Sequence, residues 1–417
     1  MEHFIINGKK PLAGKVLISG SKNATLPIMA ASLISNGEVV LKGVPDLEDI
    51  TVMSEALKLF GAKVDRENDT LIINSRNLNS CELPEDISRK MRASNLVMGA
   101  LLARFNEAKV AYPGGCAIGT RPMDLHLKGF ESLGHRISDG HSYMTGKGGN
   151  LEGTEILLDF PSVGATENIM MAASVIPGIT TIRNAAREPE IIDLQNFLNC
   201  LGAKITGAGS DTIRIKGVNE LGSGEHQIIP DRIEAGTFMV AAAITRGEVE
   251  LQNVILEHIQ PVVAKLKEIG VEVIPYKAGL IVKANKRLRN TDIKTMPYPG
   301  FPTDMQAQMM ALLATVNGTS IIVETIFENR FMHVQELRRM AAEIKIEGRV
   351  AIIKGKSKLE GAIVEATDLR AGAALVLAGL AAEGETIINK IAHIDRGYDK
   401  FHIKLSDLGA EIIRKLE

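Results

Sequence analysis

The sequence predicts an α/β fold in two domains, an inside-out α/β barrel arrangement in which buried helices lie behind outer sheets. Three observations support this prediction: the length of 417 residues, a helix ending that recurs six times, and an apolar helix that recurs roughly 40 residues before each ending. A chain of this length exceeds the size at which one hydrophobic core usually stops growing. Two domains of three units each are therefore the simplest division.

The first repeated element is an amphipathic helix that stops at a glycine and leads into an alternating strand. The stopping residues are Gly61, Gly134, Gly202, Gly270, Ala341 and Gly409. By subtraction, the successive spacings are 73, 68, 68, 71 and 68 residues. Spacing this regular indicates six pseudo-repeats of about 70 residues.

The second repeated element is a short helix with almost no charges. Its six versions begin at Ala24, Ala93, Ala165, Ala235, Asp304 and Ala371. A helix that is apolar all round is buried on every side. Each is followed by a break and a β-branched strand, such as GEVVLKGV or GTSIIVET. An open solenoid is the alternative, but it would show capping repeats and an exposed binding face.

Composition excludes several classes of protein. The formal net charge is −2 and there is no long basic run, which argues against a general nucleic-acid binder. The first residues, MEHFIINGKKPLAGKV, lack the features of a signal peptide, and no apolar run is long enough to span a bilayer. Three cysteines favour a reducing compartment, so we expect a cytoplasmic protein. Because metal-ligand spacings are absent, we expect neither a metal nor another cofactor.

Polar residues gather where the buried helices begin. They are Lys22 and Asn23, Arg92, the Ser162-Val163-Gly164 turn, Asp231 and Arg232, Asp304, and Asp368 with Arg370. If all six helix N-termini point into one cleft, that cleft attracts a polyanion. For any single residue, a helix cap or a solvated charge is the more common interpretation. The recurrence in all six units favours a functional one.

Eight segments carry a resemblance to a known family. They are SGSKNA (19–24), PGGCAIGTRPMDLH (113–126), NAAREPEI (184–191), PDRIEAGTF (230–238), FPTDMQAQ (301–308), FENRFMHV (327–334), ATDLRAGAALVLAG (366–379) and HIDRGY (393–398). In this order they resemble the enolpyruvyl transferases, specifically the UDP-N-acetylglucosamine 1-carboxyvinyltransferases, over essentially the whole chain. The resemblance implies a domain of residues 22–229, with a catalytic lid loop at 112–121. A second domain then combines residues 1–21 with 230–417.

The resemblance also implies a reaction. The enolpyruvyl group of phosphoenolpyruvate moves to the 3′-hydroxyl of UDP-N-acetylglucosamine through a tetrahedral intermediate, and phosphate is released. This is the first committed step of peptidoglycan precursor synthesis. The expected partners are these two substrates, with no nucleic acid, membrane or obligatory protein partner.

Similarity to the family assigns roles to particular residues. Those it implies for catalysis are Cys116, Asp304, Lys22, Asn23, Arg396 and Asp368. Lys22, Arg121 and Arg396 are expected on the phosphate, Arg370 and Arg396 on the carboxylate, and Asn23 on the intermediate. Asp304 resembles the base toward the attacking hydroxyl, Asp368 is the second candidate, and an ordinary N-cap is the alternative for Asp304.

The remaining substrate-binding residues are assigned mostly by resemblance. The expected uridine segment is Arg121, Pro122, Met123, Asp124 and Leu125, and the diphosphate turn is Ser162, Val163 and Gly164. Asp304 and Ile326 match positions that face the sugar, and Arg92 completes the set. Phe160 stands where some relatives have lysine, and it either stacks on uracil or belongs to the core.

Cys116 lies in a glycine-rich loop, where glycines permit mobility and Arg121 favours a thiolate. The resemblance makes it the lid cysteine that is alkylated by fosfomycin and acts as an acid or in product release. Cys200 and Cys81 fit a buried, inert thiol better. Three rival functions are 5-enolpyruvylshikimate-3-phosphate synthase, a non-catalytic repeat scaffold and an RNA-end-processing enzyme of related fold. The PGGC and RPMDL segments argue against the shikimate enzyme, and the polar clusters argue against a scaffold. The near-neutral charge argues against an RNA-processing enzyme.

Overall fold

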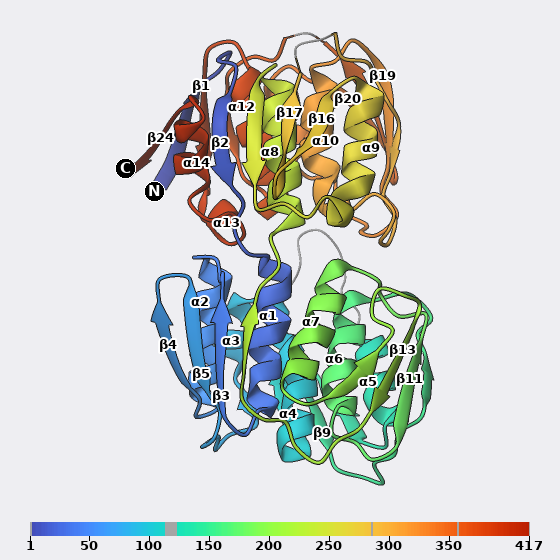
Figure 1. Ribbon diagram of the computed structural model, residues 1–417. Coiled ribbons are helices and arrows are strands. Elements are labelled where there is room, and N and C mark those ends of the chain that lie inside the picture. Colours follow the sequence, from blue (N-terminus) through green and yellow to red (C-terminus); the bar gives the residue numbers. More distant parts are fainter. Residues whose placement is uncertain (1, 113–122, 285–286, 357, 417) are drawn as a thin grey trace. The chain divides into compact units, whose positions relative to one another are not determined.

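The computed structural model describes residues 2–112, 123–284, 287–356 and 358–416, and of Arg92 only the backbone. The chain forms two compact units (Figure 1). The terminal unit contains both chain ends and comprises Met1–Ser19 and Pro230–Glu417. The inserted unit lies within residues 20–229. Each unit has its own continuous hydrophobic core.

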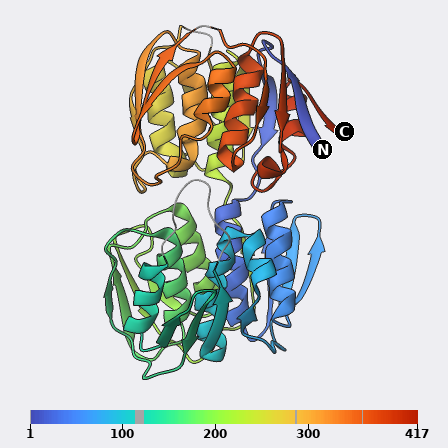
Figure 2. The ribbon, with the colours of Figure 1, turned by 180° about the vertical axis from the view of Figure 1, so that it is seen from behind.

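Three buried helices form the centre of each unit, as predicted. In the inserted unit they are α1 (Lys22–Ala31), α4 (Val97–Phe105) and α6 (Val163–Ala173); in the terminal unit they are α8 (Arg232–Ile244), α10 (Gln306–Ala314) and α12 (Leu369–Ala381). Every residue of α10 is buried: seven of its nine residues are apolar, and the amide side chains of Gln306 and Gln308 are buried with them. Figures 1 and 2 show α8, α10 and α12 side by side, with sheets outside them. Short 3₁₀ turns, Arg92–Leu96 and Thr303–Met305, precede α4 and α10.

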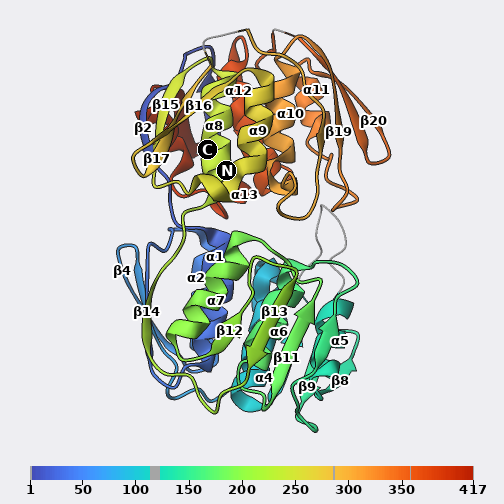
Figure 3. The same cartoon turned by 45° about the vertical axis from the view of Figure 1, so that its right-hand side comes forward.

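Six four-stranded sheets cover these helices, and all six have the same order: a parallel pair followed by two antiparallel neighbours. In the inserted unit the sheets are β14 (Gly224–Gln227), β3 (Glu38–Lys42), β5 (Thr70–Asn74) and β4 (Lys63–Glu67); β6 (Glu82–Leu83), β7 (Glu107–Ala111), β9 (Tyr143–Lys147) and β8 (Arg136–Asp139); and β10 (Glu155–Leu157), β11 (Ile179–Arg183), β13 (Thr212–Lys216) and β12 (Lys204–Thr206). In the terminal unit they are β2 (Ala13–Leu17), β15 (Glu248–Gln252), β17 (Gly279–Lys283) and β16 (Glu272–Tyr276); β18 (Ile293–Lys294), β19 (Gly318–Val323), β21 (Val350–Gly355) and β20 (Glu343–Glu347); and β22 (Ile363–Glu365), β23 (Glu385–Asn389), β1 (Glu2–Asn7) and β24 (Glu411–Leu416). Figure 3 shows β2, β15, β17 and β16 together at the left of the terminal unit. The α/β prediction with inner helices and outer sheets is confirmed.

An outer helix in each repeat ends as the sequence predicts. These helices are α2 (Glu48–Leu59), α5 (Asp124–Ser132), α7 (Pro189–Cys200), α9 (Gln260–Ile269), α11 (Val334–Arg339) and α14 (Phe401–Asp407). All six stopping residues have positive φ, from 64° at Ala341 to 107° at Gly202. A left-handed residue ends a helix and turns the chain back toward the sheet. Two further helices, α3 (Glu85–Lys90) and α13 (Ala392–Asp395), are short.

The chain passes between the units at two neighbouring points. Ser19 accepts a hydrogen bond from the backbone N–H of Asp231 at 2.8 Å, and Ile229 accepts one from Ser21 at 2.7 Å. The first bond lies in the terminal unit and the second in the inserted unit. The two connecting segments, residues 19–21 and 229–231, are therefore hydrogen-bonded to each other where the chain passes from one unit to the other.

Candidate active site

One ion-pair cluster gathers the polar residues near the starts of α10 and α12 in the terminal unit. Oδ1 of Asp304 accepts a hydrogen bond from Nη2 of Arg330 at 3.0 Å. Oδ2 accepts from Nε and Nη2 of Arg370 at 3.2 and 2.9 Å. The side chains of Arg330 and Arg370 are 3% and 4% exposed, whereas Asp304 is 27% exposed. One accessible carboxylate thus holds two buried guanidinium groups.

The guanidinium of Arg370 is fixed from its face as well. It lies over the ring of Tyr398, 5.4 Å from the centroid, and the Tyr398 hydroxyl bonds to Thr237 and Gln308 at 2.9 and 3.2 Å. Burial disfavours the charge, but Asp304 and Tyr398 more than offset it and raise the pKa of Arg370. Nη1 of Arg370 has no hydrogen-bond partner among the described residues. This arginine is therefore held in place and charged, with one buried donor that no described residue uses.

Asp368 and Asp304 have different local roles. Oδ1 of Asp368 accepts the N–H groups of Arg370 and Ala371 at 2.9 and 3.1 Å, so Asp368 is the N-cap of α12. The carboxylate of Asp304 instead forms ion pairs, and α10 begins two residues later at Gln306 without a side-chain cap. The alternative that Asp304 is an ordinary N-cap is wrong, because its carboxylate is drawn to the two arginines.

Two neighbours of this cluster were not singled out from the sequence, although both lie in the quoted segment FENRFMHV. Arg330 is the first. The second is His333, which is 1% exposed. Burial lowers the pKa of His333 to about 4, with Asp368 opposing and Arg330 adding to the effect. A neutral imidazole therefore lies beside the cluster at pH 7.

In the inserted unit, Lys22 is the first residue of α1 and forms a shielded ion pair. Its Nζ lies 3.1 Å from Oδ2 of Asp49, and the two side chains are 12% and 6% exposed. Ser21 caps the helix by accepting from the N–H of Ala24. Asn23 follows Lys22 and is partly buried, and the 3₁₀ turn that begins at Arg92 packs against α1. Asp49, on α2, was not predicted from the sequence.

The two segments predicted for the nucleotide lie next to each other. Met123 and Asp124 open α5, with Leu125 partly buried, and Ser162 caps α6, whose first residues are Val163 and Gly164. A Cβ atom on Gly164 would lie 3.1 Å from Cε1 of His126, so the segments touch where glycine provides room.

His126 joins these segments through Asn168 of α6. Nδ2 of Asn168 lies 2.9 Å from Nδ1 of His126. Since the amide nitrogen can only donate, Nδ1 accepts and Nε2 carries the proton. Burial lowers the pKa of His126 to about 4, which keeps the ring neutral.

Several predicted residues are placed less completely. Cys116, Arg121 and Pro122 lie outside the described residues. Arg396 follows α13 as its C-cap and is partly buried. The backbone N–H of Ile326 donates to Oε1 of Glu324 at 2.8 Å.

Two predictions about ordinary core residues are corrected. Cys200 is exposed rather than buried, because α7 turns Phe197 and Leu198 inward and leaves Cys200 on its outer side. Cys81 is only partly buried, and that burial raises the pKa of its thiol. Phe160 is 45% exposed, which excludes a core role.

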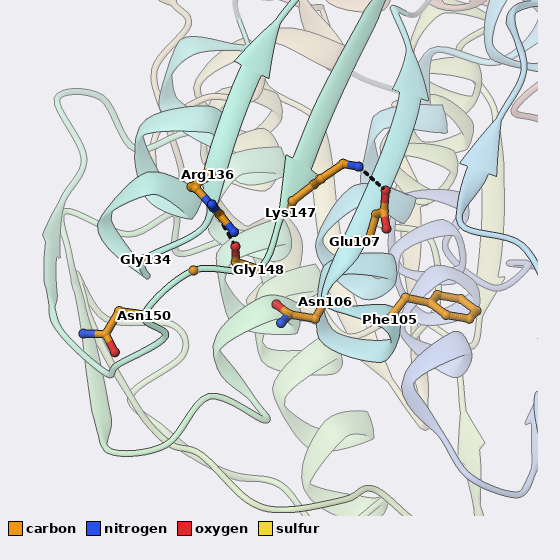
Figure 4. Close-up of a pocket in the computed structure, with 9 residues that line it drawn as sticks. Phe105, Asn106, Glu107, Gly134, Arg136, Lys147, Gly148 and Asn150 are labelled. Carbon is orange, nitrogen blue, oxygen red and sulfur yellow. Dashed lines mark hydrogen bonds and ion pairs between the residues drawn. The ribbon is translucent and has the colours of Figure 1, made fainter.

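A pocket of about 740 Å³ in the inserted unit contains none of the predicted site residues (Figure 4). Its lining includes Phe105, Asn106, Glu107, Gly134, Arg136 and Lys147. Lys147 pairs with Glu107 at 2.9 Å, and Nε of Arg136 donates to the carbonyl of Gly148 at 3.0 Å. Its charges are thus engaged with the protein itself. In the part of the chain that the structure describes, no cluster of His, Cys, Asp and Glu is arranged to hold a metal, and no helix could span a membrane.

The repeated α/β units define an inside-out α/β protein, and its terminal unit places two buried arginines around Asp304. The sequence model of the EPSP synthase (3-phosphoshikimate 1-carboxyvinyltransferase) family matches residues 6–405 of this chain. The chain belongs to this family of enolpyruvyl transferases. Its similarity extends to proteins named UDP-N-acetylglucosamine 1-carboxyvinyltransferase: 60% identity with one from Caldanaerobacter subterraneus, 58% with one from Carboxydothermus hydrogenoformans and 55% with one from Halalkalibacterium halodurans. Alignments cover 99–100% of this chain and 95–99% of those proteins.

Solved structures agree with this assignment. The enolpyruvyl transferase NikO from Streptomyces tendae superposes with a TM-score of 0.90 at 25% identity, over 99% of both chains. An EPSP synthase from Acinetobacter baumannii superposes with a TM-score of 0.78 at 18% identity over the full length of both, which supports the fold alone.

Proposed function

We propose that this chain transfers the enolpyruvyl group of phosphoenolpyruvate to the 3′-hydroxyl of UDP-N-acetylglucosamine and releases phosphate. The observation that carries the proposal is the 60% identity, over 99% of the chain, with a UDP-N-acetylglucosamine 1-carboxyvinyltransferase. The Asp304 cluster supports it, because the reaction needs a carboxylate base beside cations that bind an anionic substrate.

The cationic side chains suit a small substrate with two anionic groups. We assign Lys22, Arg121 and Arg396 to the phosphate, and Arg370 with Arg396 to the carboxylate. The planar fork of arginine engages carboxylate oxygens in pairs, and Nη1 of Arg370 is a donor that no described residue uses. The ion pair with Asp49 holds the Lys22 side chain in a fixed direction.

Chemistry then proceeds by addition and elimination. A proton is added to C3 of phosphoenolpyruvate, and the sugar oxygen bonds to C2 while its own proton passes to Asp304. The tetrahedral intermediate, which Asn23 contacts, next loses a C3 proton and the phosphate group. The products are the enolpyruvyl ether and inorganic phosphate, so no oxidant or reductant is needed.

Asp304 becomes a more available proton acceptor after a change of partners. In the free protein both of its oxygens are engaged by guanidinium groups. A substrate carboxylate that binds Nη1 and Nη2 of Arg370 as a pair competes with Asp304 for Nη2. Binding of phosphoenolpyruvate thereby releases an oxygen of Asp304 toward the sugar hydroxyl, which couples substrate binding to the availability of the base.

The remaining residues are assigned to the parts of UDP-N-acetylglucosamine. We propose that residues 121–125 bind uridine, that Ser162, Val163 and Gly164 bind the diphosphate through hydroxyl and backbone N–H groups, and that Ile326 faces the sugar. The start of α6 suits an anion because its N–H groups point outward. Cys116 supplies acid chemistry or assists product release. The reaction belongs to peptidoglycan precursor synthesis in the cytoplasm.

A phosphate-release assay with phosphoenolpyruvate tests the acceptor. We expect release with UDP-N-acetylglucosamine and none with shikimate 3-phosphate. Release with shikimate 3-phosphate alone would establish the other branch of the family and refute the proposal. The control omits phosphoenolpyruvate.

A further inference from the structure

The buried carboxylate of Glu324 bonds to the two turns that carry Asp304 and Ile326, the residues proposed to face the sugar. Glu324 follows strand β19 and is 0% exposed. Oε1 accepts hydrogen bonds from the hydroxyl of Thr295 at 2.9 Å and from the backbone N–H groups of Ile326 and Phe327 at 2.8 and 3.3 Å. Oε2 accepts from the hydroxyl of Thr303 at 2.9 Å.

These four donors come from three stretches of the chain, because Ile326 and Phe327 are neighbours. Thr303 begins the 3₁₀ turn that carries Asp304, and Ile326 lies in the turn after β19. Thr295 makes further bonds to the turn after β19, because its hydroxyl accepts from the N–H of Thr325 and its carbonyl accepts from the Thr325 hydroxyl. Glu324 thus sets the position of the Asp304 turn relative to the Ile326 turn.

The use of a charged group here is unusual. Glu324 forms no ion pair with any residue the structure describes, so hydrogen bonds alone offset the cost of burying it. A buried polar group of this kind is weak evidence for stability, since an apolar residue of similar size often stabilises as well. What an apolar residue cannot do is hold two turns at once in directions set by four hydrogen bonds.

We propose that Glu324 is a positioning residue for the transfer reaction. It holds Thr303 and Ile326 so that Asp304 and the backbone of Ile326 are correctly placed, relative to each other, to contact the acceptor sugar. This inference rests on the proposed function. It adds a residue that makes no contact with the reacting atoms and acts only through Thr303 and Ile326.

Thr303 offers the sharper test, because a single hydroxyl can be removed with little change of shape. Thr303→Val deletes the bond to Oε2 of Glu324, while Thr303→Ser keeps a hydroxyl there. A displacement of the order of 1 Å at a catalytic group costs about a hundredfold in rate. We expect Thr303→Val to lower kcat at least tenfold at a temperature where the variant is fully folded, and Thr303→Ser to stay within about threefold of wild type. Some loss of melting temperature is expected for Thr303→Val, because Oε2 of buried Glu324 loses its donor.

Variants of Glu324 itself provide the second arm. Glu324→Gln can keep every bond, because one oxygen still accepts from Ile326 and the amide can donate to the Thr303 hydroxyl, so we expect nearly normal kinetics. Glu324→Ala removes both anchors and should lower kcat and raise the KM for UDP-N-acetylglucosamine. Glu328→Ala is the matched control, because that carboxylate is about half exposed and pairs with Arg349 at the surface.

The outcomes separate positioning from a purely structural role. If Thr303→Val lowers the melting temperature but leaves kcat and KM unchanged, Glu324 only stabilises the fold and the inference is overturned. The Thr303 pair decides the matter even if Glu324→Ala does not fold. Turnover by the wild-type protein is measured first in the acceptor assay, so an unaltered Thr303→Val variant contradicts this inference alone and not the proposed function.

Discussion

Asp304 shows how one side chain takes a different role in the free protein from the one proposed during reaction. Its two oxygens neutralise Arg330 and Arg370, which are buried and would be costly to leave without a counter-charge. The same contacts aim the carboxylate, which remains partly accessible to solvent. In the proposed mechanism, an anionic substrate that binds Arg370 would free part of this carboxylate to act as the base.

Replacing Asp304 tests whether its carboxylate accepts the proton of the sugar hydroxyl. Asp304→Asn keeps the shape but cannot accept the proton of the sugar hydroxyl, so turnover should fall about a hundred- to ten-thousand-fold. Circular dichroism provides the control for folding, because the variant also leaves two arginines without a counter-charge. Turnover within about threefold of wild type would move the role of base elsewhere, with Asp368 the next candidate.

The proposed role of Cys116 is tested with fosfomycin, a phosphonate epoxide. A thiolate opens a strained ring far better than a carboxylate, although an aspartate still exchanges protons. We expect Cys116→Asp to remain active and become insensitive, and Cys116→Ala to lose both sensitivity and most turnover. Mass spectrometry should locate one adduct on Cys116.

Cys200 makes this a demanding experiment, because it is exposed and thus open to the reagent. Cys200→Ser is the matched control and should leave inhibition unchanged. An adduct on Cys200 or Cys81, or full inhibition of Cys116→Asp, would remove Cys116 from the proposed chemistry.

At the scale of the element, the six outer helices share one ending but not one residue. Five end at glycine, and the sixth ends at Ala341 with φ of 64°. A left-handed conformation is costly for a residue with a Cβ atom and nearly free for glycine. The repeat therefore contains a natural comparison between two residues in the same backbone geometry.

We expect Ala341→Gly to stabilise the protein by up to about 1 kcal/mol, since relief of the left-handed strain exceeds the entropy that glycine adds to the unfolded chain. Gly409→Ala should destabilise by about 1 kcal/mol. An added Cβ at Gly409 meets nothing within 4 Å, so the backbone conformation alone is tested there. Urea unfolding midpoints measure both, and shifts in the opposite directions would contradict the shared role.

At the scale of the whole molecule, the first strand of the chain completes its last sheet. Strand β1 lies between β23 and β24, with Glu2 opposite Leu416, and Phe4 and Ile6 are 0% exposed. The chain ends are therefore adjacent, and the terminal unit depends on its first residues although most of it is encoded after residue 229.

Two variants test whether the terminal unit needs strand β1 itself or needs it at the start of the sequence: a deletion and a circular permutation. Deleting residues 1–7 leaves β23 and β24 without their shared partner and should abolish soluble, active protein. Joining the two ends by a short flexible linker and opening the exposed β12–β13 hairpin after Gly209 should preserve turnover within about threefold, because exposed loops accept new termini. Phosphate release measures both, and an active deletion would show that β1 is dispensable.

Much of this architecture was readable from the sequence because it depends on local patterns. A helix without charges is buried whatever surrounds it, and a glycine every 70 residues or so marks the same helix ending each time. Long segments in a fixed order indicated the family, which the comparisons confirmed. Local patterns thus determined the repeat and the layers, and the resemblance of the quoted segments indicated the kind of enzyme.

The partners of the polar side chains were decided only by the tertiary structure. Arg330 and Arg370 are 26 and 66 residues from Asp304, and Glu324 reaches Thr303 across 21 residues. Periodicity tells which face of an element is buried, but not which neighbour from another repeat meets it. Cys200 was misjudged for the same reason, since an apolar sequence context did not reveal which side of α7 faces outward. Ion pairs and buried hydrogen bonds are set by the packing of whole repeats, and that information exists only in three dimensions.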